Sequence, residues 1–121
     1  MRWAGAWPED PNWLESEKVC LIAASRAVIC QATVLVRLPM SHSLKDRRQV
    51  TRSLVRRLRN RYNVSAVDAS DDSWQMASIV VASAGPTRAH AQRTAQAAAA
   101  FIEAQLDEGE IVVSRIEVIY P

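Results

Sequence analysis

Histidine and cysteine, which most often act as catalytic bases, nucleophiles or zinc ligands, are few and lie far apart in the sequence. His42 and His90 are the only histidines, and Cys20 and Cys30 are the only cysteines. These positions do not have the spacing of a zinc site, and no candidate nucleophile stands beside a base. The sequence therefore predicts no metal, no cofactor and no catalytic residue. The alternative is an enzyme in which a histidine or Asp68 acts as an acid or a base.

Polar and aromatic residues gather where the sequence predicts a hairpin turn. Asp68, Asp71 and Asp72 could in principle hold magnesium, since this ion prefers carboxylate oxygens. Aspartate is also a common turn residue, because its short side chain bonds the nearby backbone, and we interpret the three as part of a turn. Trp74 and Gln75 follow directly. The tryptophan either stacks on a nucleic-acid base or packs against the end of the sheet or a partner subunit.

The densest chemical signal is a run of cations at positions 45–61. This segment holds eight basic residues and one acid, Asp46, so its net charge is +7. Because the whole chain carries +2, the remainder carries −5. Such an uneven distribution of charge favours an anionic partner. The alternative is an ordinary solvated helix face, which is often charged.

Helical spacing gathers most of these cations on one side, which we call the basic stripe. At about 100° per residue they fall within about 80° of one another, opposite the apolar face. Arginine suits phosphate because its planar guanidinium donates two parallel hydrogen bonds. Cations near the start of a helix also meet the positive end of its dipole, a cost that a bound anion would relieve. The basic stripe consists of Lys45, Arg48, Arg52, Arg56 and Arg59.

A strand and a helix are the first elements expected to position this stripe. Apolar residues alternate along 28–39, which predicts a strand that ends at Pro39. Ser43 and Asp46 have the spacing of a capping box, so a helix is expected to start there. Asn63 is expected to end this helix in a left-handed conformation. The apolar stripe of the helix recurs every four residues and consists of Val50, Leu54, Leu58 and Tyr62.

The second half of the chain predicts two strands, a helix and a last strand. Residues 64–70 and 74–85 have the composition of two strands joined in a hairpin. Pro86 suits the first turn of the following helix, and the last strand is expected over 111–119. The apolar ladder of that second helix is Ala91, Ala95, Ala98, Ile102 and Leu106.

The element order βαββαβ predicts an α+β fold. In the ferredoxin-like, split βαβ arrangement, two helices cover one face of a four-stranded antiparallel sheet. Many unrelated functions use this fold, so it identifies none by itself. The uncovered face is apolar enough to predict a homodimer, either through that face or through a strand edge. It is expected to carry Ile29, Leu35, Ile79 and Val81 among Gln31, Thr33 and Ser83.

One domain preceded by a tail is expected for a chain of 121 residues. Residues 1–27 hold three tryptophans and two prolines without a clear period. This tail is expected to be disordered, to form a short helix over 12–25, or not to be translated, and the domain then spans 28–121.

Isolated glycines leave no phosphate-binding loop, and no apolar run reaches the about 20 residues that span a bilayer. Two cysteines without a CxxC motif favour a cytoplasmic location.

Several short words, spread over most of the chain, carry a family resemblance. They are SLKDRR (43–48), SLVRRLRNRYNVS (53–65), WQ (74–75), RAH (88–90) and FIE (101–103). In this order they resemble the YlxP-like family, bacterial proteins with a domain of unknown function. The resemblance runs from about Val28 to the C-terminus. This chain departs from the family pattern in the tail, which has no counterpart there. It is also one residue shorter than the pattern between Asn63 and Trp74, so the resemblance assigns no role to the aspartates of that segment.

The resemblance implies a small cytoplasmic ferredoxin-like protein without assigned catalytic residues. Family members are often encoded beside translation-initiation and ribosome-maturation genes, which implies contact with RNA or a ribosomal subunit. Our leading hypothesis is therefore an RNA- or ribosome-associated accessory factor that binds the phosphate backbone through the basic stripe. The alternative is a non-enzymatic interaction or assembly module that docks the same face on an acidic protein partner.

Overall fold

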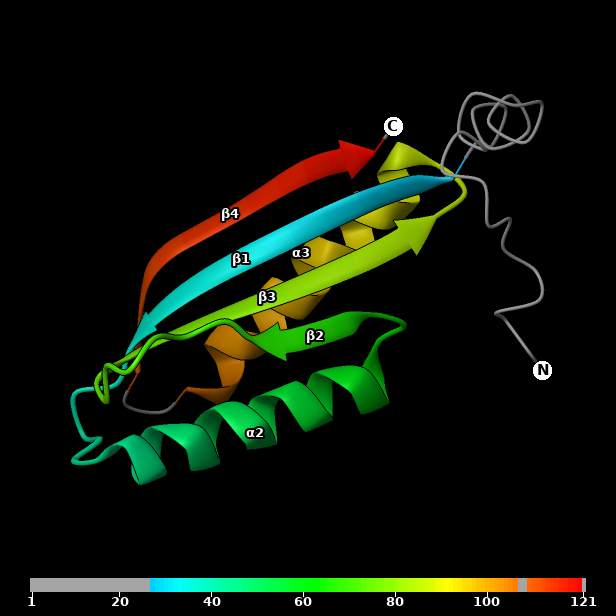
Figure 1. Ribbon diagram of the computed structural model, residues 1–121. Coiled ribbons are helices and arrows are strands. Elements are labelled where there is room, and N and C mark those ends of the chain that lie inside the picture. Colours follow the sequence, from blue (N-terminus) through cyan, green and yellow to red (C-terminus); the bar gives the residue numbers. More distant parts are fainter. Residues whose placement is uncertain (1–26, 107–108, 121) are drawn as a thin grey trace, which may run out of the picture.

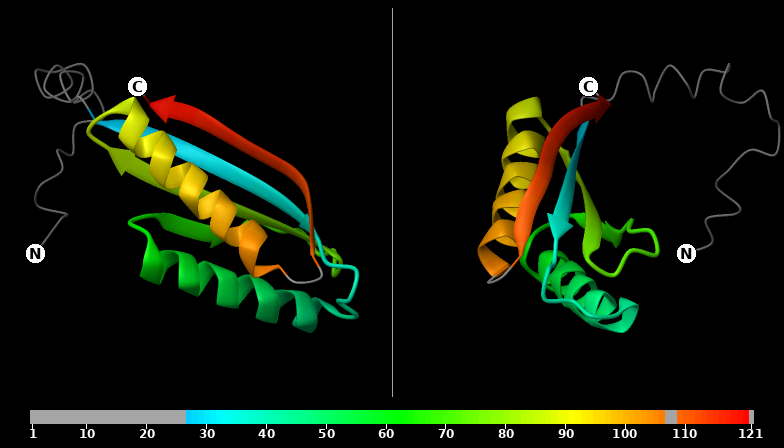
Figure 2. Two further views of the ribbon diagram at one scale, coloured as in Figure 1. Left: turned by 180° about the vertical axis from the view of Figure 1, so that it is seen from behind. Right: turned by 90° about the vertical axis from the view of Figure 1, so that its left-hand side faces the viewer.

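The chain forms a four-stranded antiparallel sheet with two helices on one face (Figure 1; Figure 2). The computed structural model describes residues 27–106 and 109–120, so the predictions for residues 1–26 lie outside the described residues. In chain order the elements are β1 (Val28–Arg37), α2 (Leu44–Arg61), β2 (Ser65–Asp68), β3 (Met76–Gly85), α3 (Arg88–Gln105) and β4 (Glu110–Tyr120).

The strand order β2-β3-β1-β4 places β1 and β3 in the centre of the sheet and β2 and β4 at its edges. All three neighbouring pairs are antiparallel. α2 packs against β2 and β3, whereas α3 packs against β1, β3 and β4. This is the ferredoxin-like arrangement, and the predicted fold class is confirmed.

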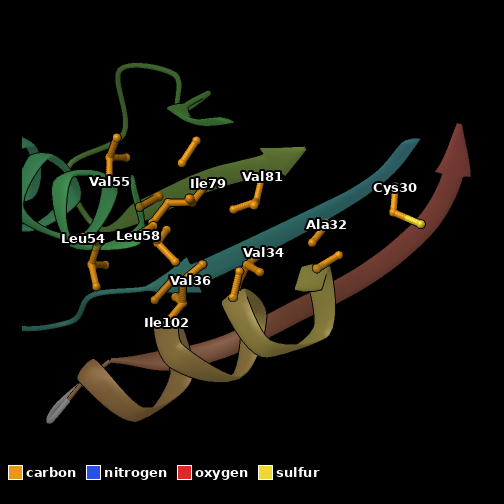
Figure 3. Packing of buried hydrophobic residues seen from close by; sticks show 14 of the residues in the cluster. Cys30, Ala32, Val34, Val36, Leu54, Val55, Leu58, Ile79, Val81 and Ile102 are labelled. Atoms are coloured by element: carbon orange, nitrogen blue, oxygen red, sulfur yellow. The ribbon is translucent and has the colours of Figure 1, made fainter. Parts of the chain in front are cut away.

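The hydrophobic core lies between the sheet and the two helices (Figure 3). Successive side chains of a strand face opposite sides of a sheet, so alternate residues of β1 point into this core. They meet Leu54 and Leu58 from α2 and Ile102 from α3. The buried residues of β1 include Cys30, Ala32, Val34 and Val36. Cys30 is thus a core residue.

Helix α2 begins as predicted but ends differently. The Ser43 hydroxyl accepts a hydrogen bond from the Asp46 N–H at 3.1 Å, and the Asp46 carboxylate accepts one from the His42 N–H at 3.1 Å. At the other end, Tyr62 adopts an extended conformation and its N–H donates to the Leu58 carbonyl. The predicted left-handed end at Asn63 is wrong, because none of the described residues, Asn63 included, has a positive φ.

Helix α3 packs closely on the sheet because its buried face is made mainly of alanine. Four members of the predicted ladder are fully buried, whereas the fifth, Leu106, caps the end of the helix and is only partly buried. The buried members are Ala91, Ala95, Ala98 and Ile102. The Ser83 hydroxyl of β3 donates to the Ala91 carbonyl at 2.8 Å, which is possible only at a short distance between helix and strand. The expectation for Pro86 is wrong, since Thr87 caps this helix and the proline precedes the cap.

The uncovered face of the sheet differs from the expectation along β3. Ile79, Val81 and Ser83 are buried under the helices, because they pair with the core-facing residues of β1. The uncovered face is formed instead by the other parity of β3, which includes Val80 and Ala82. The error arises because β3 is apolar at consecutive positions, so that its sequence does not distinguish the two faces. On β1, Ile29 and Leu35 do lie on the uncovered side.

Candidate nucleic-acid interface on helix α2

The basic stripe lies on the solvent side of α2. Lys45, Arg48, Arg52 and Arg56 are all exposed. None of these four makes an ion pair or a side-chain hydrogen bond with any residue of the described ranges. Because α2 turns once in about 5.4 Å, the four cations form a line along the helix. The stripe can therefore meet several anionic groups that are themselves arranged in a line.

The fifth residue of the stripe, Arg59, is exposed but engaged. Its Nη2 donates to the Ala66 carbonyl of β2 at 2.7 Å. Two further arginines of α2 contact α3: Arg57 donates to the Gln105 side chain at 2.7 Å, and the Arg61 guanidinium lies 5.2 Å from the centre of the Phe101 ring. These contacts hold α2 against the sheet and α3 and leave the other four cations of the stripe available.

Arg47, another of the eight cations of the 45–61 segment, is buried. Its side chain is only 4% exposed. Nη1 donates to the carbonyls of Asp71 and Ser73 at 2.6 and 3.0 Å, and Nη2 lies 3.8 Å from a carboxylate oxygen of Asp68. The arginine therefore ties the first turn of α2 to the loop between β2 and β3. One of the eight cations counted in the sequence is thus internal and does not belong to the surface.

A periodic signal for the burial of Arg47 exists in the sequence. Arg47, Thr51, Leu54 and Leu58 recur at steps of four, three and four residues, which is the spacing of one helix face. All four are buried. The apolar stripe expected from the sequence is correct for the two leucines, but its outer members Val50 and Tyr62 are only partly buried. The buried face is therefore rotated toward β2.

Asp68 is the acidic partner within this polar cluster. Thr51 donates to its carboxylate at 2.9 Å, and the Ser70 N–H donates at 2.9 Å. Burial, the largest single influence, raises the pKa of Asp68, but the hydrogen bonds from Ser70 and Thr51 and the charge of Arg47 together lower it below its usual value. Its negative charge is thus matched internally. Asp71 lies in the loop and accepts the Ser73 N–H, as a turn residue does, whereas Asp68 is the last residue of β2 and accepts the Ser70 N–H.

A shallow groove of about 450 Å³ runs between the basic stripe and the edge strand β2. Arg52, Arg56 and Arg59 form its basic side, and Val55 and Val67 supply apolar surface. Asn60 and Asp68 complete the lining. A groove with arginines on one side and apolar carbon in its floor can accept a charged backbone together with part of an attached ring.

Trp74 and Gln75 lie in the loop that leads into β3. Trp74 is 45% exposed. The Gln75 carbonyl accepts a hydrogen bond from the Leu38 N–H at 2.7 Å, which fixes the loop to the end of β1. Arg47 binds Ser73, the residue before the tryptophan, so Trp74 lies at the end of the sheet where α2 begins. Whether this ring stacks on a base or contacts a partner stays a prediction.

No group of three or more histidine, cysteine, aspartate or glutamate side chains within the described residues is placed to hold a metal ion. His42 and His90 are both exposed; His42 lies in the loop before α2, whereas His90 lies in the first turn of α3. Neither helix of the described ranges is long and apolar enough to cross a membrane.

Comparison with known proteins gave one family and one curated relative. The family model described as protein of unknown function (DUF503) matches residues 29–116. The uncharacterized protein YlxP of Bacillus subtilis (strain 168) is 32% identical over 76 residues, which are 62% of this chain and 82% of that protein. The match covers β1 to most of β4 and includes the whole of α2 with its basic stripe.

Proposed function

The chain belongs to the DUF503 family of proteins of unknown function, and from this premise we propose that it binds RNA as a cytoplasmic accessory factor of the ribosome. The contact surface in this proposal is the basic stripe of α2, which lies against the phosphate backbone. Arginine and lysine side chains supply most of the affinity in such contacts, and they carry little sequence information. Recognition is therefore expected to depend on the shape and charge of the RNA.

The observation that carries this proposal is the separation of the cations of α2 into two sets. Arg47, Arg57, Arg59 and Arg61 have partners within the described chain. The others, Lys45, Arg48, Arg52 and Arg56, have none there. Packing and helix stability explain the first set. The like charges of the second set repel one another along one helix face, which destabilises the helix. An anionic ligand would remove this repulsion.

The test is a salt series of the affinity of the full chain for ribosomal subunits and for the RNA extracted from them. For about four phosphate contacts, the logarithm of the association constant should fall with the logarithm of salt at a slope of about −3 to −4. Replacing Arg48, Arg52 and Arg56 together by glutamine should reduce that slope by about 2 to 3. At about 0.1 M salt the affinity should fall on the order of 100-fold.

The matched control replaces three exposed arginines outside α2 by glutamine, namely Arg37, Arg88 and Arg93. It changes the net charge by the same amount, so the slope should change little if the stripe makes the contacts. Equal losses in both triple variants would show that only net charge matters and would contradict the proposal. Absence of binding by the unmodified chain at low salt would also contradict it and would favour the acidic protein partner.

A further inference from the structure

β4 is an edge strand whose outer side is unpaired in the part of the chain that the structure describes (Figure 1). Open edges invite pairing with another strand, and proteins usually protect them with short length, lysine, proline or a covering segment. The opposite edge, β2, has only four residues, and Arg59 occupies one of its carbonyls. β4 has eleven residues and contains neither lysine nor proline, so its protection is limited to three charged side chains and two shifts of register against β1 near its ends. The two edges of the sheet are therefore protected to different degrees.

Hydrogen bonds elsewhere in the sheet determine which backbone groups of β4 face outward. The Leu38 N–H donates to the Gln75 carbonyl, so the even-numbered residues of β1 direct their backbone groups toward β3 and the odd-numbered ones toward β4. Thr33 pairs with Arg115 in a regular register. The odd-numbered residues in this part of β4 therefore face β1, and the N–H and C=O groups of Ser114, Ile116 and Val118 face the open edge.

The core is also incomplete at this edge. On β1, the residues that face the helices are fully buried, whereas Ile111, Ile116 and Val118 of β4 face the same side and are only partly buried. A groove of about 230 Å³ separates β4 from α3, and Ala99 and Ala100 form part of its helical wall. Small side chains on α3 leave room there for another apolar surface.

The charges of β4 complement a second copy of the same strand in one register. Arg115 and Glu117 lie on the uncovered face, paired with each other at 2.6 Å and both accessible to solvent. If two antiparallel copies meet with Ile116 opposite Ile116, then Arg115 of each copy lies opposite Glu117 of the other. Centring on Arg115 or on Glu117 would place like charges opposite each other, which is destabilising. Of these three registers, only the one centred on Ile116 places opposite charges opposite each other.

The same register agrees with the backbone. Ile116 and its neighbours on the open edge would form the hydrogen-bonded pairs, so Arg115 and Glu117 would be a non-hydrogen-bonded pair, in which side chains approach more closely. Val113, which pairs with Leu35 and is 48% exposed, lies on the uncovered face next to this charged pair. One two-fold arrangement therefore pairs the open backbone groups of β4, places opposite charges together and covers apolar surface.

We propose that β4 pairs with β4 of a second copy of this chain, antiparallel and centred on Ile116, to form a dimer with a continuous eight-stranded sheet. The partner completes the core at the β4 edge and closes the groove beside α3. Because the basic stripe lies beside β2 at the opposite edge, the dimer presents its two stripes at the two ends of the extended sheet. This inference does not depend on the proposed RNA binding.

The test is the dissociation constant of the full chain, measured by sedimentation equilibrium, with charge-reversed variants. Arg115→Glu alone and Glu117→Arg alone should each weaken dimerisation at least about tenfold, because they place like charges opposite each other. The double variant R115E/E117R restores opposite charges and should return the dissociation constant to within about threefold of the unmodified value. Circular dichroism establishes that each variant is folded.

A backbone variant tests the edge without changing charge. The N–H of Ser114 faces the open edge and makes no hydrogen bond to β1. Ser114→Pro removes this N–H and should therefore abolish the dimer without disturbing the β1–β4 pair. Ser114→Ala keeps the N–H and should keep the dimer. Three results would overturn the proposal: a monomer at every concentration up to about 0.1 mM, a dimer insensitive to these variants, or a double charge swap as weak as the single reversals. Insensitivity would place the interface on the uncovered sheet face or assign the edge to another segment.

Discussion

Arg47 and Arg48 are neighbours in the sequence, yet the fold gives them different environments. Arg47 lies inside the protein with its guanidinium on two loop carbonyls and near the Asp68 carboxylate. Arg48 is exposed and has no partner in the described residues. A helix rotates about 100° from one residue to the next, so adjacent arginines can serve packing and binding separately.

Removing the Arg47 side chain should destabilise the protein strongly. Arg47→Ala would leave the carbonyls of Asp71 and Ser73 without their donor and Asp68 without its cation. We expect the free energy of unfolding to fall by about 2 to 4 kcal/mol. Urea denaturation measures this loss. Arg48→Ala is the matched control and should change stability by less than about 0.5 kcal/mol; similar losses in both variants would contradict the assigned burial.

The lowered pKa of Asp68 predicts a dependence of stability on pH. A carboxylate whose pKa is lower in the folded state than in the unfolded chain stabilises the fold above its usual pKa of 3.8. That contribution is lost as the pH falls through the folded pKa. The difference in unfolding free energy between the unmodified chain and Asp68→Asn should therefore be constant from neutral pH to about pH 5 and shrink below about pH 4. A difference in unfolding free energy that grows toward low pH would contradict this prediction.

At the scale of elements, the two helices contact the sheet in different ways. α2 places leucines and one polar cluster on the sheet and keeps its cations outward. α3 places alanines on the sheet, so its backbone lies close to β3, where Ser83 reaches a helix carbonyl. Close approach of a helix requires small residues at the contact. The alanine content of α3 is thus a packing feature.

Because α3 lies close to the sheet, we expect larger side chains to destabilise the protein on the buried face of this helix but not on its exposed face. Ala95 is fully buried, so Ala95→Leu should cost about 1 to 3 kcal/mol through overpacking. Ala104 lies on the same helix and is exposed, and Ala104→Leu should change stability by less than about 0.5 kcal/mol. Thermal unfolding of both variants gives the comparison. A tolerated leucine at position 95 would mean that α3 is not held so close to the sheet.

At the scale of the molecule, the sheet separates the two candidate interaction surfaces. The basic stripe lies beside β2, and the open edge lies on β4, with β3 and β1 between them. RNA binding and dimerisation can therefore occur together. If both occur, two stripes on one dimer would raise the apparent affinity for a long RNA through avidity.

The register of the central strands predicts different effects at adjacent positions of β3. Ile79 faces the core and is fully buried, whereas Val80 faces the uncovered side. Ile79→Ala should cost about 2 to 5 kcal/mol. Val80→Ala should cost less than about 1.5 kcal/mol, because its side chain loses less contact with other residues. Chemical denaturation distinguishes them, and equal costs would show that the uncovered face is itself buried in an assembly.

The sequence by itself determined those features that depend on neighbours along the chain. The alternation in β1, the cap at Ser43, the apolar ladder of α3 and the element order all follow from local periodicity and capping chemistry. Together they were sufficient for the fold class. They were also sufficient to place the basic stripe on one face of a helix, because helical geometry alone sets that angle.

Only the tertiary structure decided which of those local possibilities were used. β3 is apolar at consecutive positions, so its pairing with β1, and not its own pattern, buries Ile79 and exposes Val80. Arg47 is buried because the loop after β2 supplies carbonyls that no local pattern could reveal. The cations available for a ligand are those for which the described fold offers no partner. The spacing within α2 is consistent with Arg47 on its buried face, but each of these outcomes depends on contacts between residues far apart in the chain, which periodicity does not identify.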